Sequence, residues 1–139
     1  MVLFDDRTGV EVIDRRECLE LLAAEEVGRI AVLEGGQPLI VPVNYALDGE
    51  AIVFRTGPGS KLRASRGGPA CFEIDGFELN QHAGWSVVVR GRLEAVLPTD
   101  SVTLDRVADM AHPWIGDRPD VVRLAPDVIT GRRIRPVSE

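Results

Sequence analysis

The sequence contains few of the residues that build metal sites and disulfide scaffolds. Its two cysteines, Cys18 and Cys71, are too few and too isolated for either. Cys71 lies in an apolar segment, which is typical of a small core residue, and no histidine is close to it in the sequence. The two histidines, His82 and His112, are far apart and have no matching ligand cluster. We therefore expect no metal site.

Long apolar runs and an excess of positive charge are absent as well. No run approaches the length of a membrane span, and the acidic N-terminal segment, with Asp5 and Asp6, lacks the pattern of a signal peptide. The formal net charge of −6 argues against nucleic acid or an anionic membrane as the main partner. The 139 residues have the length of one domain, without repeats or linkers. We expect a cytoplasmic protein with a single domain over residues 1–139.

Lysine is nearly absent, because Lys61 stands alone beside 15 arginines. It follows Thr56-Gly57-Pro58-Gly59-Ser60, in which hydroxyls and flexible glycines precede a helix start. A compact ammonium beside hydroxyls and free helix N–H groups is typical of phosphate binding. The alternative interpretation is an ordinary Gly-Pro-Gly turn followed by a surface lysine. Both interpretations stay open at this point.

The hydrophobic pattern predicts short strands joined mostly by hairpins. The expected strands are residues 27–33, 38–46, 51–55, 70–74 and 85–97, followed by two tail segments with strand character, 121–124 and 128–134. The expected helices are residues 14–24, 60–66 and 99–110, and residues 76–84 are expected to form a loop. This order favours a mainly β fold, a small six-stranded antiparallel barrel with peripheral helices.

Motifs that would supply catalytic groups are missing. The Walker loop, the dinucleotide fingerprint, the serine-nucleophile elbow and the His-Glu-x-x-His motif do not occur. The sequence thus identifies no catalytic acid, base or nucleophile. A phosphate-binding segment on a small barrel without such residues favours a protein whose chemistry is supplied by a bound cofactor.

Four segments, in order, resemble the pyridoxamine 5′-phosphate oxidase-like family, and in particular its short bacterial flavin-binding split barrels. These segments are Val27-Gly28-Arg29-Ile30-Ala31-Val32, Pro38-Leu39-Ile40-Val41-Pro42-Val43-Asn44-Tyr45, Ile52-Val53-Phe54-Arg55-Thr56 with Gly59-Ser60-Lys61-Leu62, and Trp85-Ser86-Val87-Val88-Val89-Arg90-Gly91-Arg92. The resemblance covers most of the chain. It implies a six-stranded split β-barrel that forms a homodimer, with two flavin mononucleotide (FMN) sites at the dimer interface.

The resemblance also implies a role for ten residues of this sequence. Backbone groups of Val41, Pro42, Val43 and Asn44 would contact the edge of the flavin ring; Arg55, Thr56, Ser60 and Lys61 would hold its phosphate; and Trp85 and Ser86 would approach the flavin from the partner subunit. Paired cations and hydroxyls suit a phosphate that carries nearly two charges. A tryptophan at a strand start is also typical of a core residue.

The C-terminal third departs from the true oxidases. Residues 123–126, Arg-Leu-Ala-Pro, resemble their Arg-Leu-x-Pro ending, but the Arg-x-His pair that holds the vitamin phosphate is missing after Arg118. Pyridoxamine phosphate oxidation is therefore not expected. The leading hypothesis is an FMN-dependent oxidoreductase that transfers hydride to or from an unidentified small molecule. The alternatives are binding of an 8-hydroxy-5-deazaflavin coenzyme, with Arg63 and Arg66 lining a basic groove, or a non-catalytic flavin-binding or storage dimer.

Overall fold

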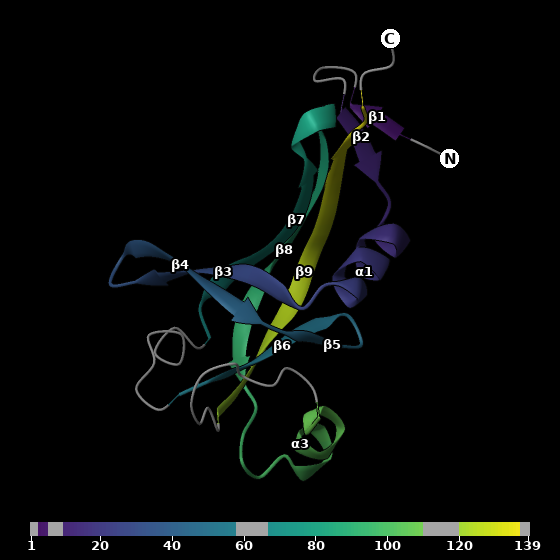
Figure 1. Ribbon diagram of the computed structural model, residues 1–139. Coiled ribbons are helices and arrows are strands. Elements are labelled where there is room, and N and C mark those ends of the chain that lie inside the picture. Colours follow the sequence, from purple (N-terminus) through teal and green to yellow (C-terminus); the bar gives the residue numbers. More distant parts are fainter. Residues whose placement is uncertain (1–2, 6–9, 58–66, 110–119, 137–139) are drawn as a thin grey trace.

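The chain forms one curled antiparallel sheet with helices packed against it (Figure 1). The computed structural model describes residues 3–5, 10–57, 67–109 and 120–136. The elements are β1 (Leu3–Asp5), β2 (Val10–Ile13), α1 (Arg15–Ala24), β3 (Val27–Glu34), β4 (Gln37–Asn44), β5 (Ala46–Asp48), β6 (Ala51–Thr56), β7 (Pro69–Glu78), a 3-10 turn (Leu79–Gln81), β8 (Ala83–Ala95), α3 (Ser101–Val107) and β9 (Asp120–Ile134).

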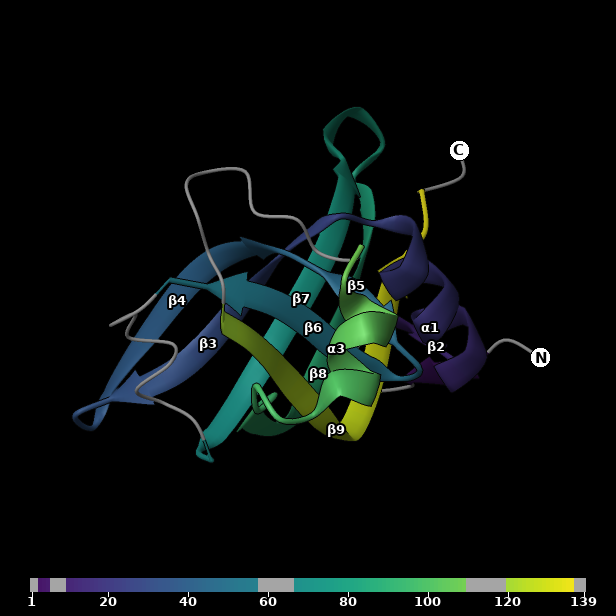
Figure 2. The ribbon, with the colours of Figure 1, turned by 90° about the horizontal axis from the view of Figure 1, so that it is seen from below.

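Strand β9 is the centre of the sheet. One of its edges pairs with β8, while the other pairs with β6 along its first half and with β2 near its end. The sheet continues from β8 through β7 and β3 to β4, and β5 extends it beyond β6. The sheet curls into a half-barrel (Figure 2). Among the described strands it stays open between β4 and β6, which do not pair with each other. The predicted split β-barrel is therefore confirmed, with β3, β4, β6, β7, β8 and β9 as its six long strands and three short ones added.

The inner face of the half-barrel holds the core. Alternate residues of β3, β7 and β8 are fully buried there, and α1 closes the core with Cys18 and Leu22. Tyr45 and Phe72 meet edge to face, with ring centroids 4.7 Å apart. A smaller cluster lies on the opposite face of β6 and β9, where α3 packs Val107 against Val53. Each such buried side chain contributes about 1.5–3 kcal/mol.

Two of the expected helices begin within two residues of the predicted start, each at an aspartate that caps it. The Asp14 carboxylate accepts a hydrogen bond from the Glu17 N–H at 2.8 Å at the start of α1. The Asp100 carboxylate accepts one from the Thr103 N–H at 3.1 Å at the start of α3. The helix expected over residues 60–66 lies outside the described residues.

Two predictions about the strands are wrong. Residues 76–84 were expected to form a loop. Instead β7 runs to Glu78 and β8 begins at Ala83, so these residues form the end of a long hairpin. The two tail segments form the single strand β9, which passes a register shift opposite Arg90 and Gly91. A Cβ atom at Gly91 would lie 1.9 Å from the Ala125 carbonyl oxygen, so glycine is required for β8 and β9 to approach here.

Candidate functional site

The end of β6 carries two of the predicted phosphate ligands. Thr56 is 1% exposed, and its hydroxyl oxygen has no hydrogen-bond partner among the residues that the structure describes. Buried hydroxyls nearly always have a partner, so an unpaired one is a feature that a ligand would explain. Arg55 is half-buried and donates one hydrogen bond, at 3.2 Å, to the Ala108 carbonyl just after α3. Its guanidinium has further donors that this contact does not use.

The other two predicted phosphate ligands lie outside the described residues. Ser60 and Lys61 follow Thr56 by four and five positions, so they belong to the segment that continues from β6. The structure therefore places half of the predicted phosphate site, and Ser60 and Lys61 stay a prediction.

The predicted ring contacts lie on the edge strand β4. Val41, Val43 and Asn44 are half-buried, while Pro42 is exposed. Strand β4 pairs with β3 along one edge, and its other edge meets no strand of the described chain. Proline has no N–H to give to a ladder, so Pro38 and Pro42 place their backbone nitrogens on that outer edge. The carbonyls of the same residues point outward too, so the edge is rich in hydrogen-bond acceptors and unsuited to further strand pairing.

The remaining predicted residues, Trp85 and Ser86, lie near the tip of the β7–β8 hairpin. Trp85 is partly buried against the core and lies over Gly76, where an added Cβ atom would come within 2.7 Å of the indole nitrogen. Ser86 points to the opposite side of the hairpin, in register with Asp75 and Arg132. The prediction of Trp85 as a possible core residue is thus partly met, since one side of the indole packs on the core.

Within one chain the structure does not bring these two groups together. Along β9, Arg55 pairs with Val121, whereas Trp85 pairs with Arg133. Twelve residues of strand separate these positions, which corresponds to about 40 Å along the strand. In Figure 1 the hairpin tip and the end of β6 accordingly lie at opposite ends of the molecule. A ligand that contacts both groups would need two copies of the chain.

An open groove of about 410 Å³ lies at the hairpin tip. Its lining includes Trp85, Phe77, Glu25, Arg133 and Arg135. Neither of these arginines was singled out by sequence reasoning, and their close spacing near the end of β9 was the only signal. The groove offers an aromatic side chain and charges of both signs, which suits a planar heterocycle better than a free phosphate.

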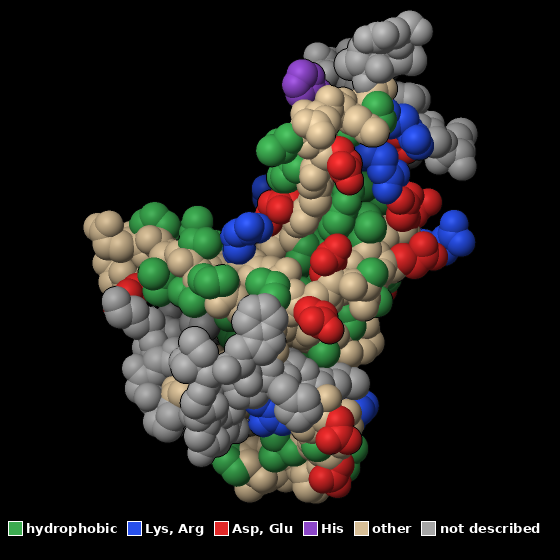
Figure 3. Space-filling view, in the orientation of Figure 1, with side chains coloured by type: hydrophobic (Ala, Val, Ile, Leu, Met, Phe, Trp, Pro, Cys, Tyr) green, Lys and Arg blue, Asp and Glu red, His purple; other side chains and the backbone are tan. Residues whose placement is uncertain are grey.

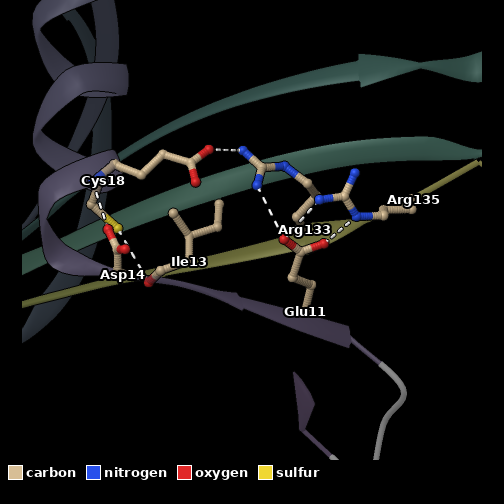
Figure 4. Close-up of polar contacts among 7 residues, drawn as sticks. Glu11, Ile13, Asp14, Cys18, Arg133 and Arg135 are labelled. Carbon is tan, nitrogen blue, oxygen red and sulfur yellow. Dashed lines mark hydrogen bonds and ion pairs between the residues drawn. The ribbon is translucent and has the colours of Figure 1, made fainter. Parts of the chain in front are cut away.

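Both groove arginines are held by acidic side chains (Figure 4). Glu11, which is buried, accepts from Arg135 at 2.5 Å and from Arg133 at 3.4 Å, and Arg133 also pairs with Glu17. The hydrogen bond from Arg135 is the main reason that the pKa of Glu11 is lowered, against the opposing effect of burial. This cluster fixes the end of β9 to β2 and α1.

A second charged cluster lies on the face of the sheet away from the core. Arg29 on β3 reaches two carboxylates of β7, Glu73 at 3.1 Å and Asp75 at 3.3 Å. Burial, together with a hydrogen bond from Asp75, raises the pKa of Glu73 to about 7. Sequence reasoning missed this pair, because it depends on the register of β3 against β7.

The remaining titratable candidates have structural roles or lie outside the described chain. Burial raises the pKa of the Cys18 thiol, which keeps it protonated and unreactive. His82 ends the 3-10 turn in the left-handed conformation, and His112 is not among the described residues. No set of three or more histidine, cysteine, aspartate or glutamate side chains in the described ranges could hold a metal ion. Within the same ranges, no helix is both long and apolar enough to span a membrane.

Comparison with known proteins gives one family. The sequence matches the family described as pyridoxamine 5′-phosphate oxidase over residues 14–133, from the helix cap to near the end of β9. Rv0080, an uncharacterized protein of Mycobacterium tuberculosis, is 32% identical over 129 residues, which cover 88% of this chain and 84% of that protein.

Solved structures agree with this match. The FAD binding protein from Mycobacterium smegmatis has 31% sequence identity and a TM-score of 0.73, with 89% of this chain and 98% of that chain covered. A FAD-binding protein from Mesorhizobium loti has 25% identity and a TM-score of 0.68, with coverage of 90% and 98%.

Proposed function

This chain belongs to the pyridoxamine 5′-phosphate oxidase family, and from that premise we propose that it is a flavin-dependent oxidoreductase that works as a homodimer. A bound flavin supplies hydride transfer to or from a small organic molecule. The chain itself has to hold the phosphate, orient the ring and exclude water. Two proteins of similar structure are FAD-binding proteins, which supports a flavin as the ligand.

The observation that carries this proposal is the buried hydroxyl of Thr56 at the end of β6, which has no hydrogen-bond partner among the described residues. A phosphate oxygen within hydrogen-bond distance of the Thr56 hydroxyl would give it a partner. The guanidinium donors of Arg55 that bind no other group would add charge-assisted hydrogen bonds. Ser60 and Lys61 follow closely enough in the sequence to complete the set. The residues present therefore fit the phosphate that FMN carries and that FAD shares.

The proposal assigns the flavin ring to the outer edge of β4. The outward carbonyls of Pro38 and Pro42 would accept from the ring N–H, while the prolines keep another strand from occupying the edge. Trp85 and Ser86 would come from the partner subunit, because about 40 Å of strand separates them from the phosphate group of their own chain. This geometry is the argument for the homodimer.

We propose FMN as the cofactor. FAD is the alternative, because the two similar proteins are FAD-binding proteins. Both flavins contain the phosphate that Thr56 would bind. Titration of the purified protein with FMN, FAD, riboflavin and an 8-hydroxy-5-deazaflavin coenzyme, followed by flavin fluorescence, separates these ligands. Riboflavin, which lacks the phosphate, should bind most weakly.

The decisive variant is Lys61→Ala. It should weaken FMN binding by about 1.5–3 kcal/mol, the range for a hydrogen bond to a charged group, and leave riboflavin binding unchanged. Lys61→Arg should recover part of the loss, because its planar fork is longer and more directional. Equal affinities of wild type and Lys61→Ala for FMN would contradict the phosphate site. Bleaching of the bound flavin by a nicotinamide donor would support turnover, whereas a flavin that no donor reduces would favour storage.

A further inference from the structure

Helix α3 contacts the sheet through a small apolar surface. Two of its seven residues, Thr103 and Val107, are buried. Val107 packs with Val53 of β6 and Val121 of β9, on the face of these strands away from the main core (Figure 2). A helix of two turns is too short to be stable by itself. With so little apolar contact, its position on the sheet depends on polar contacts as well.

The side chains of Arg106 and Asp48 form an ion pair that attaches α3 to the sheet. The Arg106 guanidinium donates two hydrogen bonds, at 2.6 Å and 2.8 Å, to the two carboxylate oxygens of Asp48, a geometry that fixes both groups. Asp48 ends β5, and its side chain is 8% exposed. Figure 3 shows acidic and basic side chains together at the lower end of the molecule, where α3 lies. The last turn of α3 is therefore fixed to the β5–β6 hairpin.

The same turn of α3 holds Arg55. Ala108 caps the helix, and its carbonyl oxygen accepts the hydrogen bond, at 3.2 Å, from Nη2 of Arg55. The last carbonyls of a helix have no partner within it and carry partial negative charge, so they attract a guanidinium. Arg106 and Ala108 are two positions apart in the sequence. The ion pair with Asp48 and the contact with Arg55 thus belong to one turn.

Arg55 needs such a contact because it leaves β6 on the side opposite to Thr56. Successive residues of a strand point to opposite faces. Thr56 shares a face with Phe54 of the core, whereas Arg55 shares the other face with Val53, against which α3 packs. A phosphate at the end of β6 would meet both residues only if the Arg55 guanidinium is held at that end. The Ala108 carbonyl is its one hydrogen-bond partner among the described residues.

We propose that Asp48 and Arg106 are positioning residues for the flavin phosphate, because their ion pair sets where the Ala108 carbonyl holds Arg55. The inference rests on the proposed function, in which Arg55 donates to the phosphate. Neither positioning residue contacts the phosphate itself, so a change at either should act through Arg55. An ion pair with a structural role alone would stabilise the fold without affecting how the protein distinguishes one flavin from another.

The ratio of FMN affinity to riboflavin affinity, measured by flavin fluorescence, tests this role. Arg106→Gln and Asp48→Asn should each weaken FMN binding about three- to tenfold and leave riboflavin binding unchanged, because riboflavin has no phosphate. Arg55→Gln, which removes the charge-assisted hydrogen bond itself, should weaken it by about tenfold or more. Arg106→Lys keeps the charge without the planar fork and should lose less than Arg106→Gln. Arg106 is 47% exposed, so its substitution is compatible with folding, which circular dichroism verifies.

A double variant and a neighbouring ion pair serve as controls. Arg106→Gln added to Arg55→Gln should lower FMN affinity no further, because two residues that act through one contact are not additive. Glu50 lies in the same hairpin as Asp48 but accepts two hydrogen bonds from Arg15 of α1. Glu50→Gln should therefore keep the wild-type ratio of FMN affinity to riboflavin affinity.

The outcomes separate the positioning role from the proposed function. Folded Arg106→Gln and Asp48→Asn proteins with the wild-type affinity ratio would overturn the inference, while a lower ratio for Arg55→Gln would still support the phosphate site. An equal loss of FMN affinity on adding Arg106→Gln to wild type and to Arg55→Gln would also overturn it, since Arg106 would not act through Arg55. A wild-type protein that binds FMN no more tightly than riboflavin would refute the phosphate site and, with it, the inference.

Discussion

The substitution Thr56→Val should have opposite effects on the stability of the flavin-free protein and on flavin binding. Valine has the shape of threonine without the hydroxyl, and in the described chain that hydroxyl is buried without a partner. Burying an unpaired polar group costs about 1–3 kcal/mol. Its removal should therefore leave the flavin-free protein as stable as wild type or raise the free energy of unfolding by about 1 kcal/mol. For a domain of this size that corresponds to an increase in Tm of about 4 °C.

The same substitution should weaken FMN binding. The lost hydrogen bond to a charged phosphate is worth about 1.5–3 kcal/mol, which is about 10- to 150-fold in the dissociation constant. Riboflavin affinity should not change. Thermal unfolding of the flavin-free protein and fluorescence titration with both flavins measure the two effects.

A second buried threonine provides the control. Thr103, on α3, makes hydrogen bonds to Asp100, so Thr103→Val should destabilise the protein and leave FMN affinity as it is. The reasoning about Thr56 would be refuted if Thr56→Val also destabilised the flavin-free protein, or if it bound FMN as tightly as wild type.

Two further predictions concern other contacts. Tyr45→Phe should lower the free energy of unfolding by about 1–2 kcal/mol, because the Tyr45 hydroxyl donates at 2.6 Å to the Leu22 carbonyl in the last turn of α1; urea denaturation measures the loss, and an unchanged midpoint would contradict it. Gly91→Ala should lower it by 3 kcal/mol or more (about the cost of a severe core clash), because its Cβ atom would overlap the Ala125 carbonyl; an equally stable variant would show that the two strands can separate there.

Local signals in the sequence were enough for much of the fold. The capping residues Asp14 and Asp100 fix where two helices begin, and each contact involves only neighbours in the chain. Strands β3, β4 and β6 follow from apolar segments and from the Asp-Gly turn before Ala51, whereas β1, β2 and the break between β4 and β5 were not predicted. The resemblance to a family added the split of the barrel, which periodicity alone does not predict.

One error arose where glycine has a packing role. Gly76 and Gly84 suggested a loop, yet they lie inside a hairpin, where the rings of Trp85 and Phe77 cover the space that a Cβ atom would take. Such a contact depends on which residues face each other across two strands, and composition does not carry that information. The same reason explains why the Glu73–Asp75 pair was missed, since it depends on a register between distant segments, whereas Thr56 was singled out from a local motif and its role stays a prediction.

The position of β9 in the chain has a consequence for the order of folding. This strand is made after all the others, yet it is the partner of β8 along one edge and of β6 and β2 along the other. During synthesis, the earlier strands therefore wait with unpaired edges until residues 120–134 leave the ribosome. Long-range pairings of this kind slow folding and expose edges that aggregate. The half-barrel should thus close late, after residues 120–134 have been synthesised.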